Sequence, residues 1–518
     1  MDEPTSSTEI ELTLRVSSQS AARLKRHELL SRWRTGKTAS RRLLTTYFDT
    51  PDFALREHKM ALRVRKVGRR HVQTVKAAAP ADQGLLTRIE DERVVPASQP
   101  DVQRVAHKKL RRFLSAPEIG ERLAPVFVTD FRRAIVPLSF RGSQIEMAID
   151  QGAIETDSGQ VPISEVELEL KRGIVADVYE VARALSEVVP VAIEPLSKAE
   201  RGYAMIAGEP PPPCRASALE LDPEGTVGAA FRLIGHNCLQ QFRANLASVQ
   251  AAVTPEGVHQ LRVSIRRLRS ALHAFRKLLP PEERARVVDQ VRWVMQACAP
   301  ARAWDVFVEE CLDPLRDHLP EDAPHEAMRE FAADVEVMRE AAQRRVVELI
   351  ANPKFTATCL ELEAWWESGA AMAMLGEAAA LPIVPFARDT IRSLARRLRA
   401  EAKGMEDRRP EELHDFRIQA KKLRYAAEFF RSLFRRKATK AYLGALASLQ
   451  DRLGSINDAI TAQNLLDELE RERPPAHPDV RARARATISG WASARIAEDL
   501  RALPELWGEV AALKPFWR

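Results

Sequence analysis

A basic helical motif occurs twice in this chain, and the duplication limits the folds open to its C-terminal half. The stretch VHQLRVSIRRLRSALHAFRKLL covers residues 258–279, and LHDFRIQAKKLRYAAEFFRSLF, residues 413–434, aligns with it without a gap. In both copies, apolar residues recur at the spacing of an amphipathic helix, so one face is predicted to be buried. A repeat whose copies are separated by further helical sequence indicates a duplicated helical unit.

The polar face of each copy is strongly basic. At about 100° per residue, one side of the first helix carries His259, Arg262, Arg266 and Arg269, matched in the second by His414, Arg417, Lys421 and Arg424. Solvated helix faces usually mix charges of both signs, because like charges four residues apart repel each other. The first copy contains no acidic residue. We therefore expect these side chains to face an anion.

Four consecutive prolines divide the chain into two regions with different patterns. They lie in GEPPPPCRAS, residues 208–217, and a proline run forms an extended spacer. Strand-like alternation dominates before the run and helical periodicity after it. The predicted fold class is therefore α+β, with an antiparallel β domain over residues 1–208, a linker over 209–218 and an all-α domain over 219–518. Within the last domain we expect two repeats, at about residues 222–370 and 385–510.

Composition excludes several classes of protein. The net charge is only +7 over 518 residues, so the basic helices favour a compact anionic ligand over a long nucleic acid. Five cysteines without a C-x-x-C pair favour a reducing cytoplasm and argue against a zinc site. The acidic, polar N-terminus does not resemble a signal peptide. The Ala-rich stretch around Glu377 is interrupted by that residue and by prolines, which argues against a membrane span.

Several predicted strands carry charged residues along one face, because side chains two residues apart share a face. Carboxylates recur at Glu9 and Glu11, at Asp150, and at Glu165 and Glu167, and arginines recur at Arg63 and Arg65. Taken singly, each strand could be an ordinary one with a wet face. Taken together, the carboxylates suit hard divalent cations and the arginines suit phosphate oxygens. Facing inward, they would line a barrel equipped for metal-assisted phosphoryl chemistry.

These residues are also motifs of a known family. In chain order they are Glu9-x-Glu11, YFDT at 47–50, Arg63-x-Arg65, Lys76, Arg88-x-Glu90-x-Glu92, Asp150-x-Gly152, Glu165-x-Glu167-x-Glu169 and SKAERGY at 197–203. The set spans about residues 8–205 and resembles the CYTH domain of the triphosphate tunnel metalloenzymes. The helical region, about residues 222–510, resembles the CHAD domain. The two in this order resemble bacterial CYTH–CHAD proteins.

The resemblance implies a fold, a reaction and a set of site residues. CYTH domains are eight-stranded antiparallel tunnels that bind a triphosphate with one or two Mg²⁺ or Mn²⁺ ions, and many hydrolyse inorganic triphosphate with a metal-held water. The implied metal ligands are Glu9, Glu11, Asp150, Glu165 and Glu167. The implied phosphate-binding residues are Arg63, Arg65, Lys76, Arg88, Arg132, Lys198 and Arg201. The CHAD resemblance implies that inorganic polyphosphate binds to the two basic helices.

One position departs from the family pattern E-x-E-x-K, since Thr13 stands where the family has a lysine. Two functions therefore stay open. The first is a triphosphatase with a polyphosphate-binding module, and the second is a non-catalytic polyphosphate-binding protein of granules whose tunnel binds without turnover. Nucleic acid is disfavoured as a partner, because the basic helices lack the interleaved aromatic residues that stack on bases. The expected location is the cytoplasm, at polyphosphate granules in the second case.

Overall fold

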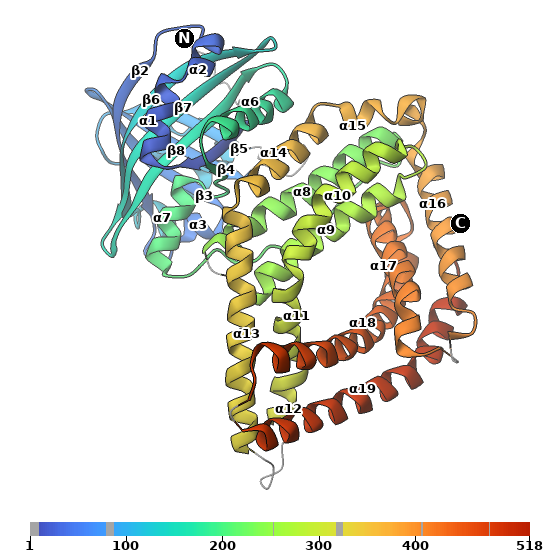
Figure 1. Cartoon of the computed structure of the whole chain (residues 1–518). Coiled ribbons are helices and arrows are strands. Elements are labelled where there is room, and N and C mark those ends of the chain that lie inside the picture. Colours follow the sequence, from blue (N-terminus) through green and yellow to red (C-terminus); the bar gives the residue numbers. More distant parts are fainter. Residues whose placement is uncertain (1–9, 79–87, 252, 318–324, 406–407, 476) are drawn as a thin grey trace. The chain divides into compact units, whose positions relative to one another are not determined.

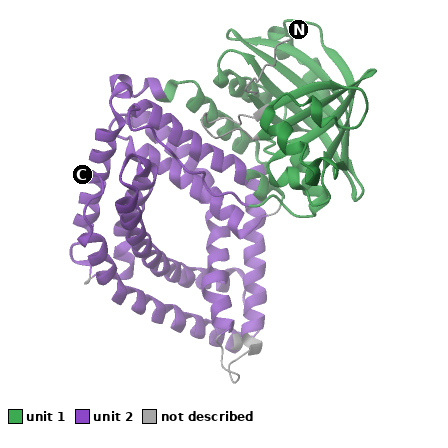
Figure 2. Ribbon diagram, turned by 180° about the vertical axis from the view of Figure 1, so that it is seen from behind, with its two compact units in different colours: residues 1–212, 246–252, 351–371 green, residues 213–245, 253–350, 372–518 purple. Residues whose placement is uncertain are grey.

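The computed structural model describes residues 10–78, 88–251, 253–317, 325–405, 408–475 and 477–518 (Figure 1). They form two compact units (Figure 2). The sheet unit consists of residues 1–212, 246–252 and 351–371, and the helical unit consists of residues 213–245, 253–350 and 372–518. The proline run did not predict that two later segments would join the sheet unit.

The sheet unit contains one antiparallel sheet, in the order β5-β4-β3-β2-β6-β7-β8-β1-β9 over the described residues. Its strands are β1 (Glu11–Val16), β2 (Ala39–Asp49), β3 (Met60–Val67), β4 (Arg70–Ala78), β5 (Arg88–Val95), β6 (Ala124–Phe140), β7 (Ser143–Thr156), β8 (Gly159–Arg172) and β9 (Val191–Ile193). The α+β class with an N-terminal antiparallel sheet is confirmed. The described sheet has nine strands where the resemblance implies eight, because the three-residue β9 pairs with β1.

Two local features hold the central strands in register. Arg141 and Gly142 both have positive φ, 48° and 89°, and form the two-residue turn that joins β6 to β7. Such a turn has the twist of an antiparallel hairpin. Farther along β7, a Cβ atom on Gly152 would lie 2.1 Å from the Asp130 carbonyl oxygen. Only glycine therefore allows β6 and β7 to approach so closely beside Asp150.

Short helices cover parts of the sheet, and one of them carries two predicted site residues. The helices of this unit are α1 (Ser18–Arg26), α2 (Glu28–Trp33), α3 (Ala54–Glu57), α4 (Lys108–Leu114), α5 (Pro117–Gly120), α6 (Val175–Val188), α7 (Lys198–Ala207) and α14 (Pro353–Glu367). A capping box between Ser197 and Glu200 begins α7. The Tyr203 hydroxyl donates to Asp49 Oδ2 at 2.8 Å, and its ring packs on Phe127. These contacts fix the backbone that carries Lys198.

The helical unit is built mainly from long helices, which Figures 1 and 2 show running along successive sides of the unit. Its helices are α8 (Val227–Ala251, whose last turn belongs to the sheet unit), α9 (Pro255–Ala274), α10 (Pro281–Ala297), α11 (Ala299–Phe307), the short α12 (Asp313–Asp317), α13 (His325–Ala351), the short α15 (Ala370–Ala373) at the boundary with the sheet unit, α16 (Ile383–Glu401), α17 (His414–Phe429), α18 (Arg436–Glu472) and α19 (Pro478–Ala512). Among the described helices, none combines the length and apolar character needed to cross a bilayer.

The two copies of the motif fold as equivalent helices that meet each other. α9 and α17 end at positions that the sequence alignment matches, and the residues that follow them are Phe275 and Phe430. The centres of those two rings lie 6.2 Å apart. The ring centre of Phe386 on α16 lies 4.8 Å from that of Phe275 and 6.3 Å from that of Phe430. Contact between equivalent residues is the arrangement that an approximate two-fold axis produces.

None of the five cysteines forms a disulfide. Cys214, in the proline-rich segment, is exposed, whereas Cys238, Cys298, Cys311 and Cys359 are buried. Burial raises the pKa of Cys238 and Cys298 to about 11 and that of Cys311 to about 12. The buried thiols are therefore protonated at neutral pH and act as small apolar groups.

Candidate functional site

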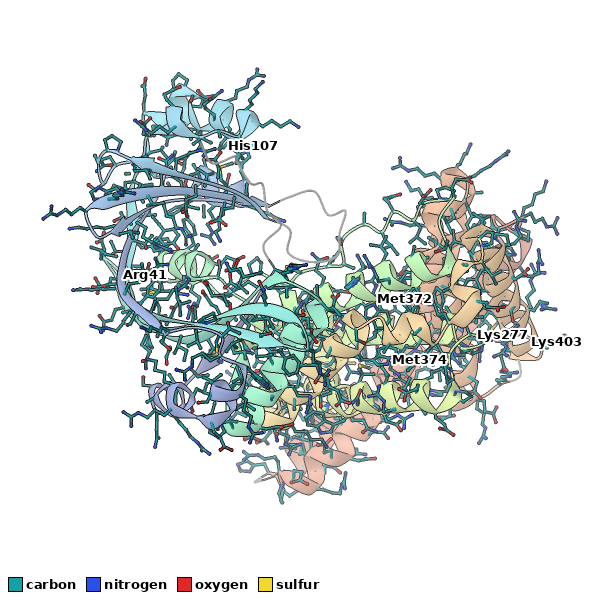
Figure 3. The ribbon with its side chains drawn as sticks, turned by 90° about the horizontal axis from the view of Figure 1, so that it is seen from above. Arg41, His107, Lys277, Met372, Met374 and Lys403 are labelled. Carbon is teal, nitrogen blue, oxygen red and sulfur yellow. The ribbon has the colours of Figure 1, made fainter. Side chains whose placement is uncertain are left out.

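The strand register places the predicted charged residues on one face of the sheet, which we call the inner face. Residues directly opposite each other share a face. Along β6, β7, β8 and β1 the register aligns Arg133, Asp150, Glu165 and Arg15, and the next row aligns Ala148, Glu167 and Thr13. Across the sheet it pairs Tyr47 with Arg63, and Lys76 with Glu90. Arg41 extends the first row on β2 and is exposed (Figure 3).

Curvature brings the two halves of the inner face toward each other. Three strands separate β3 from β8 in the sheet. Even so, the charge of Glu167 on β8 acts on Arg65 of β3. Burial and the charge of Arg63 lower the pKa of Arg65, and the negative charge of Glu167 opposes that lowering. A flat sheet would hold these strands too far apart for such an interaction. The inner face is therefore concave, with basic residues on β3 and β4 opposite acidic residues on β7 and β8.

Three carboxylates converge on the acidic side. Asp150, Glu165 and Glu167 each offer an oxygen, and these oxygens lie within 4.8 Å of one another. Asp150 and Glu165 are fully buried, and Glu167 is half-buried. Convergent carboxylate oxygens are the donor set that Mg²⁺ and Mn²⁺ prefer. These three residues, which we call the carboxylate cluster, therefore fit the divalent cation that the family implies.

Three cationic side chains contact the carboxylate cluster. Lys198 Nζ lies 2.8 Å from Asp150 Oδ2 and 2.5 Å from Glu167 Oε1, and also contacts Glu165. Arg133 donates to both Asp150 oxygens, at 2.8 and 2.6 Å, and to Glu167. Arg201 pairs with Glu165. Burial alone would raise the pKa of Glu167, but Lys198 and Arg133 outweigh it and hold that pKa far below its usual value. Glu167 is therefore ionised, and cations of the protein itself lie against all three carboxylates.

The basic side of the inner face has fewer neutralising groups. Glu90 Oε1 lies 3.5 Å from Lys76 Nζ and 3.9 Å from Arg63 Nη2. Arg65 Nε donates to Thr45 Oγ1 at 3.2 Å, and no ion pair of Arg65 is seen within the described ranges. Guanidinium groups placed in this way can accept a phosphate through paired charge-assisted hydrogen bonds.

Arg132, one of the predicted phosphate-binding residues, does not lie on the inner face. Arg132 lies opposite Gln151 in the register, so it faces away from the concave side, toward α1, where Lys25 Nζ bonds to Gln151 at 2.8 Å. Its neighbour Arg133 lies on the inner face instead. In the sequence DFRRAI the two arginines are adjacent, so the alternation of side chains between the two faces of a strand does not show which of them faces inward. Only the pairing of β6 with β7 decides this.

The other predicted tunnel residues are Glu11, Glu9 and Arg88, and of these only Glu11 has a described side chain. Glu11 is exposed on β1, lies on the inner face opposite Glu169, and contributes to raising the pKa of Arg133. Thr13 lies opposite Glu167, and its hydroxyl donates to Glu11 Oε1 at 3.4 Å. Glu9 and the side chain of Arg88 lie outside the described part of the chain, although the backbone of Arg88 begins β5.

In the helical unit, the basic faces of α9 and α17 lie next to each other. Burial and the charge of Arg266 on α9 lower the pKa of Arg417 on α17. Burial, Arg417 and Arg266 lower the pKa of Lys421 to about 7. Arg262 Nη1 donates to the Met295 carbonyl at 2.7 Å, and Arg417 Nη1 to Asn457 Oδ1 at 3.0 Å. We call the residues Arg262, Arg266, Arg269, Arg417 and Lys421 the basic surface.

Two of the residues predicted to bind polyphosphate, His259 and Arg424, are not free cations. Burial and Arg302 lower the pKa of His259 to about 4, so His259 is neutral at neutral pH. Arg424 Nε lies 2.8 Å from Glu428 Oε1, so its charge is already paired. His414 is exposed at the start of α17. His259 therefore adds a hydrogen-bonding group more than a charge.

Sequence reasoning missed Arg284 and Arg397, two cations that extend the basic surface beyond the repeated motif. Burial, Arg276, Lys422, Arg397 and Arg284 all lower the pKa of His273 near the end of α9. No described ion pair involves Arg276, Arg284 or Arg397. Arg284 and Arg397 lie on α10 and α16, outside the repeated motif, so the repeat could not identify them. Lys277, which follows α9, is also exposed (Figure 3).

The match between the copies also fails at one position. Arg267 aligns with Lys422 but is buried, where it donates to Asn237 Oδ1 at 2.6 Å and Gln241 Oε1 at 2.9 Å. Its guanidinium lies 5.5 Å from the ring centre of Phe429. Arg267 is therefore a packing residue, because amide oxygens and an aromatic face satisfy it inside the unit.

Family models match both regions of the chain. The CYTH domain model matches residues 7–203, and the CHAD domain model matches residues 234–467. The chain belongs to the proteins in which a CYTH domain precedes a CHAD domain. The CYTH match covers every strand of the sheet from β1 to β9, and the CHAD match runs from α8 into α18.

Two relatives support the two domains separately. An inorganic triphosphatase of Haemophilus influenzae is 34% identical over 196 residues, which cover 38% of this chain and 54% of that protein. This chain therefore spans about half the length of that curated relative. The crystal structure of the CHAD domain from the plant Ricinus communis is 32% identical and has a TM-score of 0.51, covering 58% of this chain and 98% of that one.

Proposed function

We propose that the CYTH domain of this protein hydrolyses inorganic triphosphate with the help of Mg²⁺ or Mn²⁺. The observation that carries the proposal is the carboxylate cluster opposite Arg63 and Arg65 on one concave face. Phosphoryl transfer needs charge neutralisation and a fixed orientation more than covalent chemistry from the protein, and this face offers both. The triphosphatase from Haemophilus supports the same choice of reaction.

Each side of the inner face has a separate role in this reaction. Asp150, Glu165 and Glu167 would hold the cation, which supplies Lewis-acid polarisation and a water of lowered pKa. Arg63, Arg65 and Lys76 bind phosphate oxygens and neutralise the negative charge of the substrate. The apolar residues Phe127 and Phe131 and the ring of Tyr203 fill one end of the inner face and exclude water there.

The direct test is phosphate release by the full chain from triphosphate, pyrophosphate and ATP, each with Mg²⁺ and with Mn²⁺. We expect release from triphosphate to depend on the metal and to exceed release from the other two substrates. Binding of triphosphate without release, for every metal, would favour the second candidate, a non-catalytic polyphosphate-binding protein.

Thr13 is the residue that motivates the second candidate, and it can be tested by itself. We expect Thr13→Lys to change the kcat for triphosphate by less than about threefold, because Arg133 and Lys198 already place cations on Glu167, the residue opposite Thr13. A steady-state assay with Mn²⁺ measures the change. An increase of more than about tenfold would show that the missing lysine limits catalysis.

For the CHAD domain we propose binding of inorganic polyphosphate. The support is a set of arginines on the facing helices α9 and α17. Among the predicted residues that the structure describes, Arg424 is the one whose charge is paired with a carboxylate, that of Glu428. Polyphosphate repeats its negative charge at each unit, so it can contact cations on α9 and α17 together. Such an interaction releases bound counterions and weakens steeply as salt is added.

Lys421 makes this binding pH-dependent. Its pKa is about 7 in the folded protein, against about 10.4 for an unfolded chain. A bound anion raises that pKa, so binding takes up a proton, and affinity is expected to fall as the pH rises above about 7. Stability changes in the opposite direction: between about pH 7 and 10 the unfolded state binds more protons, so unfolding becomes harder as the pH rises.

This pH dependence is checked by measuring the Kd of polyphosphate at constant ionic strength from about pH 6.5 to pH 9. Lys421→Arg is the control, because arginine stays charged throughout this range and leaves only the titration of the polyphosphate itself. Identical pH profiles for the two proteins would contradict the role of Lys421.

A further inference from the structure

Lys198 occupies the point that the three carboxylates share. Its ammonium lies within hydrogen-bond distance of Asp150, Glu165 and Glu167, and it is itself buried. A divalent cation held by the same oxygens would have to lie at nearly the same place. An ammonium and a metal ion cannot share one position, because two cations at contact distance repel each other strongly.

Three cations of the protein already lie against the three carboxylates. Lys198, Arg133 and Arg201 make these contacts, and Arg201 also lies 3.9 Å from Glu194. A divalent ion added beside them would bring further positive charge next to buried cations, which is costly. The ion can bind only if a cation of the protein leaves the carboxylates or if an anion enters with the metal.

Lys198 is the cation that can leave. The start of α7 is fixed by its capping box and by the bond from Tyr203 to Asp49, so the backbone stays in place. The four-carbon side chain rotates, whereas Arg133 is held by two hydrogen bonds to Asp150. The basic residues on β3 and β4 attract a phosphate chain to the opposite side of the concave face, and that chain offers the Lys198 ammonium a new anionic partner.

We propose that Lys198 is an internal counter-cation that competes with the divalent metal for the carboxylate cluster, so that metal and triphosphate bind cooperatively. The inference rests on the proposed function, because it assumes that both ligands enter this site. Triphosphate draws Lys198 away and thereby strengthens metal binding. By thermodynamic reciprocity, metal strengthens the binding of triphosphate by the same factor.

The test is calorimetric titration of Mn²⁺ into the full chain, with and without a triphosphate analogue whose bridging oxygens are replaced by NH groups. We expect Lys198→Met to bind Mn²⁺ alone at least about tenfold more tightly than the unaltered protein, because the competing charge is gone. We also expect the analogue to strengthen Mn²⁺ binding less in the variant. Chelation of Mn²⁺ by the free analogue is the same in both titrations, so the difference between the proteins isolates Lys198.

Lys76→Met is the matched control. It removes a lysine from the same inner face, but Lys76 contacts Glu90 and none of the three carboxylates. A general change of potential would act on both variants, whereas local competition acts only on Lys198→Met. We expect Lys76→Met to change the Kd of Mn²⁺ by less than about twofold.

Equal or weaker Mn²⁺ binding by Lys198→Met would overturn the inference. If that variant does not fold, Lys198→Gln replaces it. If neither variant folds, the unaltered protein decides. In that case a Mn²⁺ Kd that stays the same when the analogue is added, after correction for chelation, would overturn the inference. Phosphate release separates the two proposals. Hydrolysis of triphosphate without tighter Mn²⁺ binding refutes only the competition, and tighter Mn²⁺ binding without hydrolysis refutes only the triphosphatase.

Discussion

Replacing Glu167 by glutamine is expected to lower the kcat of metal-dependent triphosphate hydrolysis by roughly 100-fold or more. Glutamine keeps the shape of the side chain but removes one of the three negative charges that converge in the carboxylate cluster. A divalent cation would then bind weakly and in a less defined position. Phosphate release at saturating triphosphate, over a range of Mn²⁺ concentrations, measures the loss.

The control is Glu169→Gln, two residues farther along β8 on the same face. Glu169 pairs with Lys171 at 2.6 Å and lies outside the carboxylate cluster, so we expect its kcat to stay within about threefold of the unaltered value. Similar losses in both variants would mean that the cluster is not the metal site. Because Glu167→Gln also leaves Lys198 and Arg133 short of one partner, it should cost about 1–3 kcal/mol of unfolding free energy, and a thermal melt must show that the variant is folded during the assay.

Replacing Arg266 and Arg417 together by alanine is expected to weaken polyphosphate binding by roughly 10- to 100-fold and to reduce its salt dependence. Arg266 lies at the centre of the basic surface, since its charge acts on His259, Arg269, Arg417 and Lys421. Fluorescence titrations with a long polyphosphate at several salt concentrations give both the affinity and the salt slope.

Arg424→Ala is the matched control for the double variant. It removes a guanidinium from the same helix, α17, but one already paired with Glu428. We expect its polyphosphate affinity to change by less than about threefold. Hydrolysis of triphosphate should be unaffected in both variants. An equal loss of affinity in Arg424→Ala would mean that total charge, and not the free cations of the basic surface, decides binding. Single-stranded DNA of matched charge tests specificity, because equal affinity for it would identify a generic anion surface.

The sequence predicted the fold class, an antiparallel sheet followed by helices, because that class depends on local periodicity. Alternation of Glu165 and Glu167 with apolar neighbours is visible without any knowledge of pairing, and so is the helical stripe of the repeat. The choice between Arg132 and Arg133 was different. Two adjacent arginines lie on opposite faces, and only the register of β6 against β7 decides which one faces the acidic residues.

Charge states could not be predicted for a similar reason. The motif counted His259 as a cation, but neighbouring arginines and burial keep it neutral, and both depend on tertiary packing. Arg284 and Arg397 belong to helices outside the motif and join the basic surface only through folding. The buried Arg267 shows the converse, since its place in the repeat matches Lys422, whose charge acts on His273, while the Arg267 side chain packs inside the unit.

The distribution of the cysteines has a practical consequence for experiments on this protein. Thiol reagents attack the thiolate, and three of the four buried cysteines, Cys238, Cys298 and Cys311, are both inaccessible and held in the protonated form. Cys359 is buried as well, and burial also raises its pKa. The native chain therefore carries a single labelling position, Cys214, directly after the proline run, where the first part of the sheet unit ends. A fluorophore or spin label attached there needs no cysteine-free background, and it reports on the mobility of that segment when triphosphate or polyphosphate is added.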